Sequence, residues 1–293
     1  MYMLTMTAIG DAYGAGFEFV KPENCPANDL SQYYTHPKYA LMAGAYTDDT
    51  QMSIAITEAI LSTNNLKSLN DYDFAKSFVE AFHRDQREAY AKGFYQFLLQ
   101  TKSAVEFMQN IIPKSKRNGA AMRACPIGCV KDVNRMLSLS AIQASTTHNT
   151  LEGIISAQAV AFMVNAMLYQ NASKKDLPRL LEKQFPTFNW KPEHTGHVDC
   201  DGIMTVQAVI TALYHNDTTA DILKACVDFA GDTDSTASIA LGIASVCDEI
   251  ENNLPQHLFD NLEKDKNGNN TPFGRPYLKQ LDDKLTQFVR VQL

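Results

Sequence analysis

Two short stretches of this sequence place paired aspartates at the start of apolar segments. In "YTDDTQMSIAITEAIL", Asp48 and Asp49 precede an apolar run, and in "FAGDTDSTASIALG", Asp232 and Asp234 precede a run of small and apolar residues. Burying ionised carboxylates in such surroundings is strongly unfavourable unless an opposite charge neutralises them. The pattern therefore raises the question of what balances these four acidic side chains.

Two interpretations of the aspartates follow from their position. Each pair lies at the expected N-terminus of a helix, where free N–H groups and the helix dipole favour anions, so the residues would be ordinary helix caps. A cap needs one carboxylate, however, and each segment supplies two with flanking hydroxyls. If the four carboxylates converge, their repulsion requires cations, and an all-oxygen donor set suits Mg²⁺ or Mn²⁺ better than Zn²⁺. Spacing alone leaves both interpretations open, because it does not show that the segments meet.

Apolar residues recur at helical spacing along almost the whole chain. Phe74, Phe78 and Phe82 are four residues apart, and proline and glycine fall mainly between the apolar segments. Patterns that alternate as strands do are essentially missing. We therefore predict an all-α protein that forms a single compact domain over residues 1–293. The polar stretch 263–276, "EKDKNGNNTPFGRP", is interpreted as a flexible surface connector.

The composition of the chain indicates which partners it can bind and in which compartment we expect it. The chain has 293 residues and a net charge of −7, and "KSKR" is its only basic cluster. Because binding of nucleic acid requires a dense basic surface, we do not expect nucleic acid to be the main partner. No apolar run approaches the ~20 residues needed to cross a bilayer, the longest candidate being 237–247. The N-terminal segment lacks the features of a signal peptide, and six cysteines without CxxC spacing predict free thiols. We expect a cytoplasmic protein without a membrane partner, and a monomer by default.

Five motifs occur in an order that carries a family resemblance. They are "GDAYGAGFEF", "YTDDTQMS", "NGAAMRACPIG", "THNTLEGIISAQAVA" and "GDTDSTASIALG". Each is weak alone, but together they resemble the ADP-ribosylglycohydrolase family, the relatives of dinitrogenase reductase-activating glycohydrolase. The resemblance runs from about residue 7 to residue 249.

The resemblance implies a compact orthogonal multi-helix fold with a binuclear Mg²⁺ cleft, in which Mn²⁺ is an alternative ion. It also implies hydrolysis of an N- or O-glycosidic bond at the anomeric carbon of ADP-ribose. The implied metal ligands are Thr47, Asp48, Asp49, Asp232, Asp234 and Ser235. Asp234 takes the bridging position. Family members often have threonine in place of Ser235 and a second glycine in place of Ala230, and we expect the latter difference to affect only local packing.

The same resemblance suggests the catalytic and substrate-binding residues. Glu18 matches the family's mobile-loop glutamate and is the candidate general acid/base, and it joins the metal ligands Asp49 and Asp234 in the predicted catalytic set. The predicted substrate contacts are Asn118, Gly119, Ala120, Met122, His148, Gly196 and Asp199. Arg123 follows the expected phosphate-contacting turn, and we expect it to pair with a buried carboxylate.

Three functions remain compatible with these residues. The first is an active hydrolase that acts on an ADP-ribosylated protein or small molecule and releases ADP-ribose. The second is a protein that binds ADP-ribosylated ligands or occludes an ADP-ribosylating toxin with the same cleft. The third is a different Mg²⁺-dependent hydrolase, such as a phosphoesterase. The acceptor stays open among arginine, serine, a nucleobase and a small-molecule conjugate.

Overall fold

A computed structural model describes residues 1–63 and 65–292, and it confirms that the protein is helical. Within these residues there is no β-strand, and the extended segments form only isolated bridges. The α-helices are α1 (Met3–Gly14), α2 (Asp48–Leu61), α3 (Asp71–Arg84), α4 (Lys92–Gln100), α5 (Ala104–Asn110), α6 (Val133–Ser145), α7 (Leu151–Tyr169), α8 (Leu177–Gln184), α9 (Gly202–His215), α10 (Thr219–Asp228), α11 (Thr233–Ala244), α12 (Gln256–Asp260) and α13 (Arg275–Gln292). Short 3-10 turns at Asn118–Ala120 and Cys125–Cys129 connect α5 to α6.

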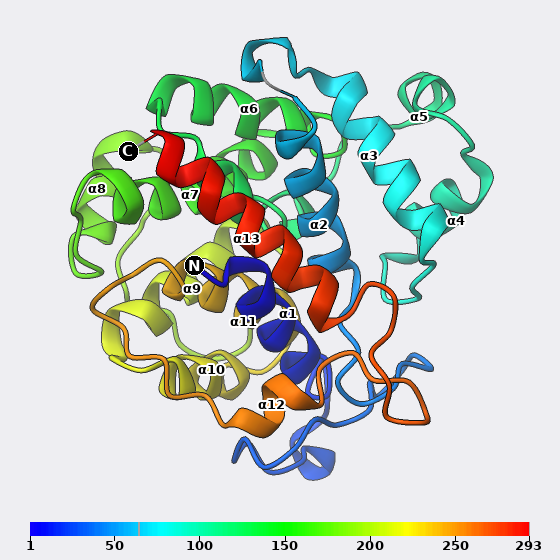
Figure 1. Ribbon diagram of the computed structural model, residues 1–293. Helices are drawn as coiled ribbons and strands as arrows, with labels where there is room; N and C mark the ends of the chain where they lie inside the picture. Colours follow the sequence, from blue (N-terminus) through cyan, green and yellow to red (C-terminus); the bar gives the residue numbers. More distant parts are fainter. Residues whose placement is uncertain (64, 293) are drawn as a thin grey trace.

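Helices α1 and α11 pack against each other at the centre of the molecule (Figure 1). Every residue of both helices is buried. Their close approach depends on the glycines of the "GDAYG" motif. A Cβ atom on Gly10 would lie 2.4 Å from the carbonyl oxygen of Ala237, and one on Gly14 would lie 2.6 Å from the Cα atom of Asp234. The first helix is therefore pressed against the turn that carries the second aspartate pair.

The other helices surround this central pair. The C-terminal helix α13 crosses in front of α1 and α2 (Figure 1). Its buried Asp282 accepts hydrogen bonds from the backbone N–H groups of Leu4 and Thr5 at 2.8 and 3.1 Å, and so caps the start of α1. The core cluster includes side chains from α1 through α13. The cluster is described for residues 1–63 and 65–292, and Asn64 and Leu293 lie outside this range. That residues 1–293 form a single domain stays a prediction.

Helix α7 corrects the expectation about apolar runs. It has 19 residues with a mean hydropathy of 1.5, which is long and apolar enough to cross a membrane by composition alone. It lies instead among α6, α9 and the Cys125–Cys129 turn, and 61% of its apolar window is buried inside the protein. A helix packed on several sides needs an apolar surface all round, which accounts for its composition.

The local sequence explains several boundaries. Asn70 and Asp73 form a capping box at the start of α3, whose phenylalanines at 74, 78 and 82 are buried as their spacing predicts. The side chain of Asp201 caps α9 by accepting from two backbone N–H groups. All six cysteines are free thiols, as predicted, and four of them are buried.

Candidate active site

The first aspartate pair is held by a buried carboxylate of α1. Asp11 accepts hydrogen bonds from the backbone N–H of Thr47 at 2.9 and 3.0 Å, from the N–H of Thr50 at 2.9 Å and from the Thr50 hydroxyl at 2.6 Å. Burial raises the pKa of Asp11 to about 6, although these hydrogen bonds oppose the shift. Asp11 therefore fixes the first turn of α2, where Asp48 and Asp49 lie.

The segment that carries Asp48 and Asp49 is also held by a residue from the C-terminal part of the chain. Glu263 accepts from the backbone N–H of Tyr46 at 2.9 Å and from Arg87 at 2.7 Å, and Arg87 also donates to the Tyr46 carbonyl. Only 2% of the Glu263 surface is exposed. The interpretation of 263–276 as a flexible connector is therefore wrong at its first residue, which is a buried partner of the segment that carries Asp48 and Asp49.

The second pair is positioned by a turn in left-handed conformation. Gly231 has φ +86°, and a Cβ atom there would lie 2.0 Å from the carbonyl oxygen of Val198. The same carbonyl accepts from the N–H of Asp232 at 2.9 Å. Ala230 also has a positive φ, +61°. Replacing the common glycine by alanine thus strains the backbone, which corrects the expectation that only local packing is affected.

Most of the aspartates are not used as helix caps. Thr47 caps α2 with its own hydroxyl, and the side chain of Asp232, although at the N-cap position of α11, makes no capping hydrogen bond. Asp234 accepts from a backbone N–H of its own turn, that of Ser235, at 2.9 Å. Capping therefore does not account for why the carboxylates are there.

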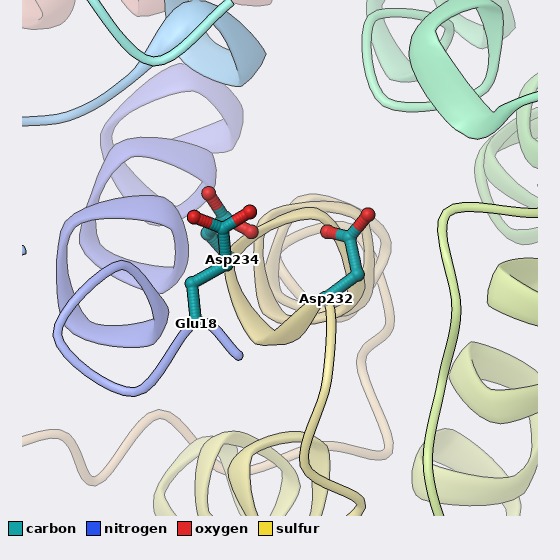
Figure 2. A group of neighbouring side chains, drawn as sticks. All are labelled: Glu18, Asp232 and Asp234. Atoms are coloured by element: carbon teal, nitrogen blue, oxygen red, sulfur yellow. The ribbon is translucent and has the colours of Figure 1, made fainter. Parts of the chain in front are cut away.

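The structure brings the two segments together, which the sequence could not show. The Ser238 hydroxyl on α11 donates to Oδ1 of Asp49 on α2 at 3.0 Å. Single carboxylate oxygens of Glu18, Asp232 and Asp234 lie within 4.8 Å of one another. Figure 2 shows Glu18 just beyond the end of α1, reaching toward the two aspartates at the start of α11.

The electrostatics of this acidic cluster call for a cation. Burial raises the pKa of Asp48 to about 8 and holds the pKa values of Asp49 and Asp234 well above their ordinary range. Neighbouring carboxylates raise all three further. Among the described residues, no lysine or arginine forms an ion pair with these three aspartates or with Asp232. The donors are all oxygens, which fits a hard divalent cation.

The cluster lies at one wall of a cavity of about 990 Å³. Its polar wall consists of Glu18, Asp48, Asp49, Asp232, Asp234 and Ser235, and Cys200 lies beside them. The cavity is also lined by Asn118, Gly119, Met122 and His148, by residues 36–39, and by Phe94 and Phe97 of α4. A cavity of this size accommodates a ligand as large as a dinucleotide.

Asn118 is tied to the acidic cluster rather than free in the cavity. Its amide nitrogen donates to Oδ2 of Asp232 at 3.0 Å and lies 3.1 Å from the Thr205 hydroxyl. Its backbone N–H donates to the carbonyl of Cys200 at 2.9 Å. The predicted substrate contact therefore also orients a predicted metal ligand.

Beside Asn118, the cavity is lined by the neutral side chain of His148, which lies close to the backbone of Gly119. Burial, and then the Arg123 charge, lower the pKa of His148 to about 3, so the ring is uncharged at neutral pH. Its Nδ1 atom lies 2.6 Å from the Thr147 hydroxyl. A Cβ atom on Gly119 would lie 3.0 Å from the ring, so glycine lets the backbone approach closely there. The histidine can offer a hydrogen bond to an anion, but not a charge.

Arg123 does not pair with a carboxylate, so that expectation is wrong. Its guanidinium donates to Oε1 of Gln143 at 2.6 Å, to the Gln143 carbonyl at 3.1 Å and to the Thr147 hydroxyl at 2.7 Å. It also stacks 4.2 Å from the Phe78 ring centre. Burial lowers its pKa to about 9. Neutral acceptors and an aromatic face stabilise this cation.

Four of the predicted site residues do not line the cavity. Thr47 is fully buried beneath the acidic cluster, and Ala120 is buried, with its carbonyl bonded to Gln143 at 3.0 Å. Gly196 and Asp199 are exposed outside the cavity wall. The cavity gives no support to Ala120, Gly196 or Asp199 as substrate contacts through their side chains, nor to Thr47 as a ligand that faces the cavity.

Sequence reasoning missed residues that the structure places beside the cluster. Asp11 lies within the quoted "GDAYG" motif, which was a usable signal. His36 and Ser238 carried none, because a histidine in "THPKY" and one serine in a small-residue helix have no distinctive spacing. The fold brings Ser238 to Asp49 and His36 to Glu18.

The fold and cavity define an all-α protein with an oxygen-rich acidic cleft suited to a divalent cation. The model of the family described as ADP-ribosylglycohydrolase matches residues 3–292. The chain therefore belongs to the ADP-ribosylglycohydrolase family and is a glycohydrolase.

Individual relatives agree with this assignment. The chain is 23% identical over 273 residues to an ADP-ribosylarginine hydrolase, Tri1, of Serratia proteamaculans, covering 87% of this chain and 72% of that protein. It is 24% identical over 247 residues to the ADP-ribosyl-[dinitrogen reductase] glycohydrolase of Rhodospirillum rubrum, covering 80% of each. A solved structure of an ADP-ribosylglycohydrolase-related protein complex superposes with a TM-score of 0.73 at 18% identity, over 98% of this chain and 97% of that one. That similarity shows the shared fold.

Proposed function

We propose that this protein hydrolyses the N-glycosidic bond between ADP-ribose and an arginine side chain, with two Mg²⁺ ions bound at the acidic cluster. The observation that carries the proposal is the gathering of buried aspartates from α2 and α11, without a cationic partner among the described residues, at the wall of a dinucleotide-sized cavity. Relatives named as ADP-ribosylarginine hydrolases favour arginine as the acceptor.

Asp48, Asp49, Asp232, Asp234 and Ser235 are the residues that would hold the ions. Ser238 and Asn118 orient two of these carboxylates, as second-layer partners of metal ligands do. When bound, divalent cations neutralise the carboxylates, orient ribose hydroxyls and supply an activated water. Burial raises the pKa of Asp234, and the charges of Glu18, Asp232 and Asp49 raise it further. Asp234 therefore interacts with acidic residues of both segments, which supports the proposal that it would be shared between the ions.

The chain's own groups account for the rest of the reaction. In hydrolysis the bond from the anomeric carbon to the guanidine nitrogen breaks, and a bond from that carbon to the water oxygen forms. The water loses a proton and the leaving guanidine gains one, so a carboxylate at the cavity edge can accept the first proton and return it. Glu18 occupies that edge, with its side chain 21% exposed. Neighbouring carboxylates also favour the positive charge that develops on the sugar.

A three-substrate assay tests the proposal. Purified protein with Mg²⁺ is incubated with ADP-ribosyl-arginine, with ADP-ribosyl-serine and with a phosphomonoester. We expect release of ADP-ribose from the arginine conjugate and loss of this activity with EDTA. Tight binding of ADP-ribose without turnover would support the binding or toxin-occluding alternative, and hydrolysis of the phosphomonoester alone would support a phosphoesterase.

A further inference from the structure

Glu18 is held by a histidine that has no role in the reaction proposed above. Oε2 of Glu18 lies 2.6 Å from Nε2 of His36, and the His36 side chain is only 1% exposed. His36 belongs to the 36–39 turn, which forms part of the cavity wall. The Tyr39 ring packs edge-on against it at 4.7 Å between ring centres. The ring is therefore fixed in place, with one edge toward Glu18.

The opposite edge of the ring determines where its hydrogen lies. Nδ1 of His36 is 3.0 Å from the backbone nitrogen of Lys38 and 3.2 Å from that of Tyr39. Both of these groups are N–H donors, so Nδ1 must be the acceptor and the neutral ring carries its hydrogen on Nε2. That hydrogen points at Glu18, so the histidine donates and the carboxylate accepts.

A backbone bond fixes the same segment from the other side. The N–H of Phe19, a residue with φ +49°, donates to the carbonyl of Gly231 at 2.8 Å. Gly231 immediately precedes Asp232, so the two segments that meet at the cluster are joined directly. The side-chain bond to His36 and the backbone bond to Gly231 together leave Glu18 little freedom to leave the cluster.

We propose that His36 is a positioning residue that fixes the Glu18 carboxylate beside Asp232 and Asp234. One Glu18 oxygen is occupied by the histidine, and the other is left for the proton that moves during hydrolysis. This inference rests on the proposed function, in which Glu18 transfers that proton. A residue that acts through Glu18 should change turnover and leave the affinity for ADP-ribose almost unchanged.

Two substitutions of His36 test the roles of its two ring nitrogens separately. His36→Gln puts an amide nitrogen near the Nε2 position and keeps a donor for Glu18. His36→Asn puts a carbonyl near the Nδ1 position and keeps the acceptor for the Lys38 and Tyr39 N–H groups. We expect His36→Asn to lower kcat by roughly 10- to 100-fold with little change in KM, and His36→Gln to recover most of that loss. His257→Ala, which removes a histidine bonded to the Leu30 carbonyl, controls for loss of an imidazole elsewhere.

A double variant and a spectroscopic measurement complete the test. If His36 acts through Glu18, His36→Asn combined with Glu18→Gln should be no slower than Glu18→Gln alone. Nitrogen-15 NMR of the histidine ring should show a protonated Nε2 and an unprotonated Nδ1, and the Nε2 signal should shift in Glu18→Gln. Equal kcat losses in the Asn and Gln variants, additive losses in the double variant, or a protonated Nδ1 would each overturn the inference.

The NMR measurement keeps this inference separate from the proposed function. If the wild-type protein turns over none of the ADP-ribosyl substrates, the proposed function fails. The ring tautomer and its response to Glu18→Gln would still show whether His36 holds Glu18. Conversely, an active enzyme in which His36→Asn has the wild-type kcat would support the proposed function and refute the positioning role of His36.

Discussion

The hydroxyl of Ser238 on α11 donates to Oδ1 of Asp49 on α2 at 3.0 Å, and so joins the two halves of the acidic cluster. The two residues are separated by 189 positions in the sequence. If Asp49 is a metal ligand as proposed, this bond keeps its carboxylate in position before a cation binds.

Removing this contact should weaken metal binding. We expect Ser238→Ala to raise the dissociation constant for Mg²⁺ by about 10-fold, because loss of an outer-layer partner has typically this effect. Isothermal titration calorimetry measures it. Ser245→Ala is the control, since the hydroxyl of Ser245, which follows the end of α11, donates to the Gly242 carbonyl at 2.7 Å. Equal Mg²⁺ affinity in both variants would show that Ser238 does not orient a ligand.

The pKa shifts in the cluster predict how the metal-free protein responds to pH. The folded-state pKa of Asp48 is raised to about 8, and the pKa values of Asp49 and Asp234 are also raised. At pH values between the unfolded and folded pKa, the folded state binds more protons than the unfolded state. Stability therefore falls as pH rises through this interval.

The interval from pH 6.5 to 8 isolates these aspartates. The pKa values of Asp11 and Asp282 are each raised to about 6, so above pH 6.5 both residues are mostly ionised in the folded and in the unfolded state. They therefore contribute little to the change of stability with pH in this interval. His148, with its pKa lowered to about 3, destabilises only below its ordinary value of 6.5. We expect the melting temperature in EDTA to fall from pH 6.5 to 8, and saturating Mg²⁺ to restore it. A flat profile in EDTA that Mg²⁺ leaves unchanged would contradict the assembled site.

The helical fold was predictable because its signal is local. The spacing of Phe74, Phe78 and Phe82 predicts one buried face of a helix, and all three are buried in α3. This pattern needs only neighbouring residues to be recognised. The order of the five motifs likewise allowed the family to be recognised.

The partners of individual side chains were not predictable, because packing decides them. The cost of burying Arg123 is evident from its apolar surroundings, but its acceptors, Gln143 and Thr147, lie 20 and 24 residues away. Glu263 begins a polar stretch that favours a surface loop, but in the fold it is buried and bonded to Arg87 and to the Tyr46 N–H. In both cases the sequence indicates a polar group and the fold chooses its partner.

The backbone strain at Ala230 predicts a stabilising substitution. Ala230 is exposed and has φ +61°, a conformation that glycine adopts without steric cost. We expect Ala230→Gly to raise the free energy of unfolding by about 0.5–1 kcal/mol, since no packing is lost. Urea denaturation measures the change. Ala27→Gly, at an exposed position outside the left-handed region, should stabilise nothing, and a similar gain there would refute the explanation.

Arg123 should be a structural residue. A lysine cannot reproduce the bonds to Gln143 and Thr147 together, so Arg123→Lys should lower the free energy of unfolding by about 2 kcal/mol. Chemical denaturation tests this, with the exposed Arg290→Lys as control. A variant with wild-type stability and a reduced kcat would instead assign Arg123 a direct catalytic role.

The roles of Asp234 and Glu18 can be separated by two substitutions. If Asp234 bridges two ions, Asp234→Ala should abolish stabilisation by Mg²⁺, affinity for ADP-ribose and turnover together. Glu18→Gln keeps the size of the side chain and an oxygen that can accept the bond from His36. It removes proton transfer, so single-turnover rates should fall by about 10²–10⁴-fold while ADP-ribose binding stays nearly intact.

The structure makes one outcome of this comparison especially informative. Glu18 was predicted to lie outside the metal-binding motifs, yet its carboxylate lies within 4.8 Å of those of Asp232 and Asp234. Both variants are therefore titrated first with Mg²⁺ and then with ADP-ribose at saturating Mg²⁺, before hydrolysis is measured. If Glu18→Gln loses Mg²⁺ affinity in step with its rate, Glu18 is a metal ligand and not the proton carrier. If it turns over normally while Asp234→Ala is inactive, the bound ions activate the water without it. A slow Glu18→Gln with intact binding of both ligands leaves proton transfer as its role.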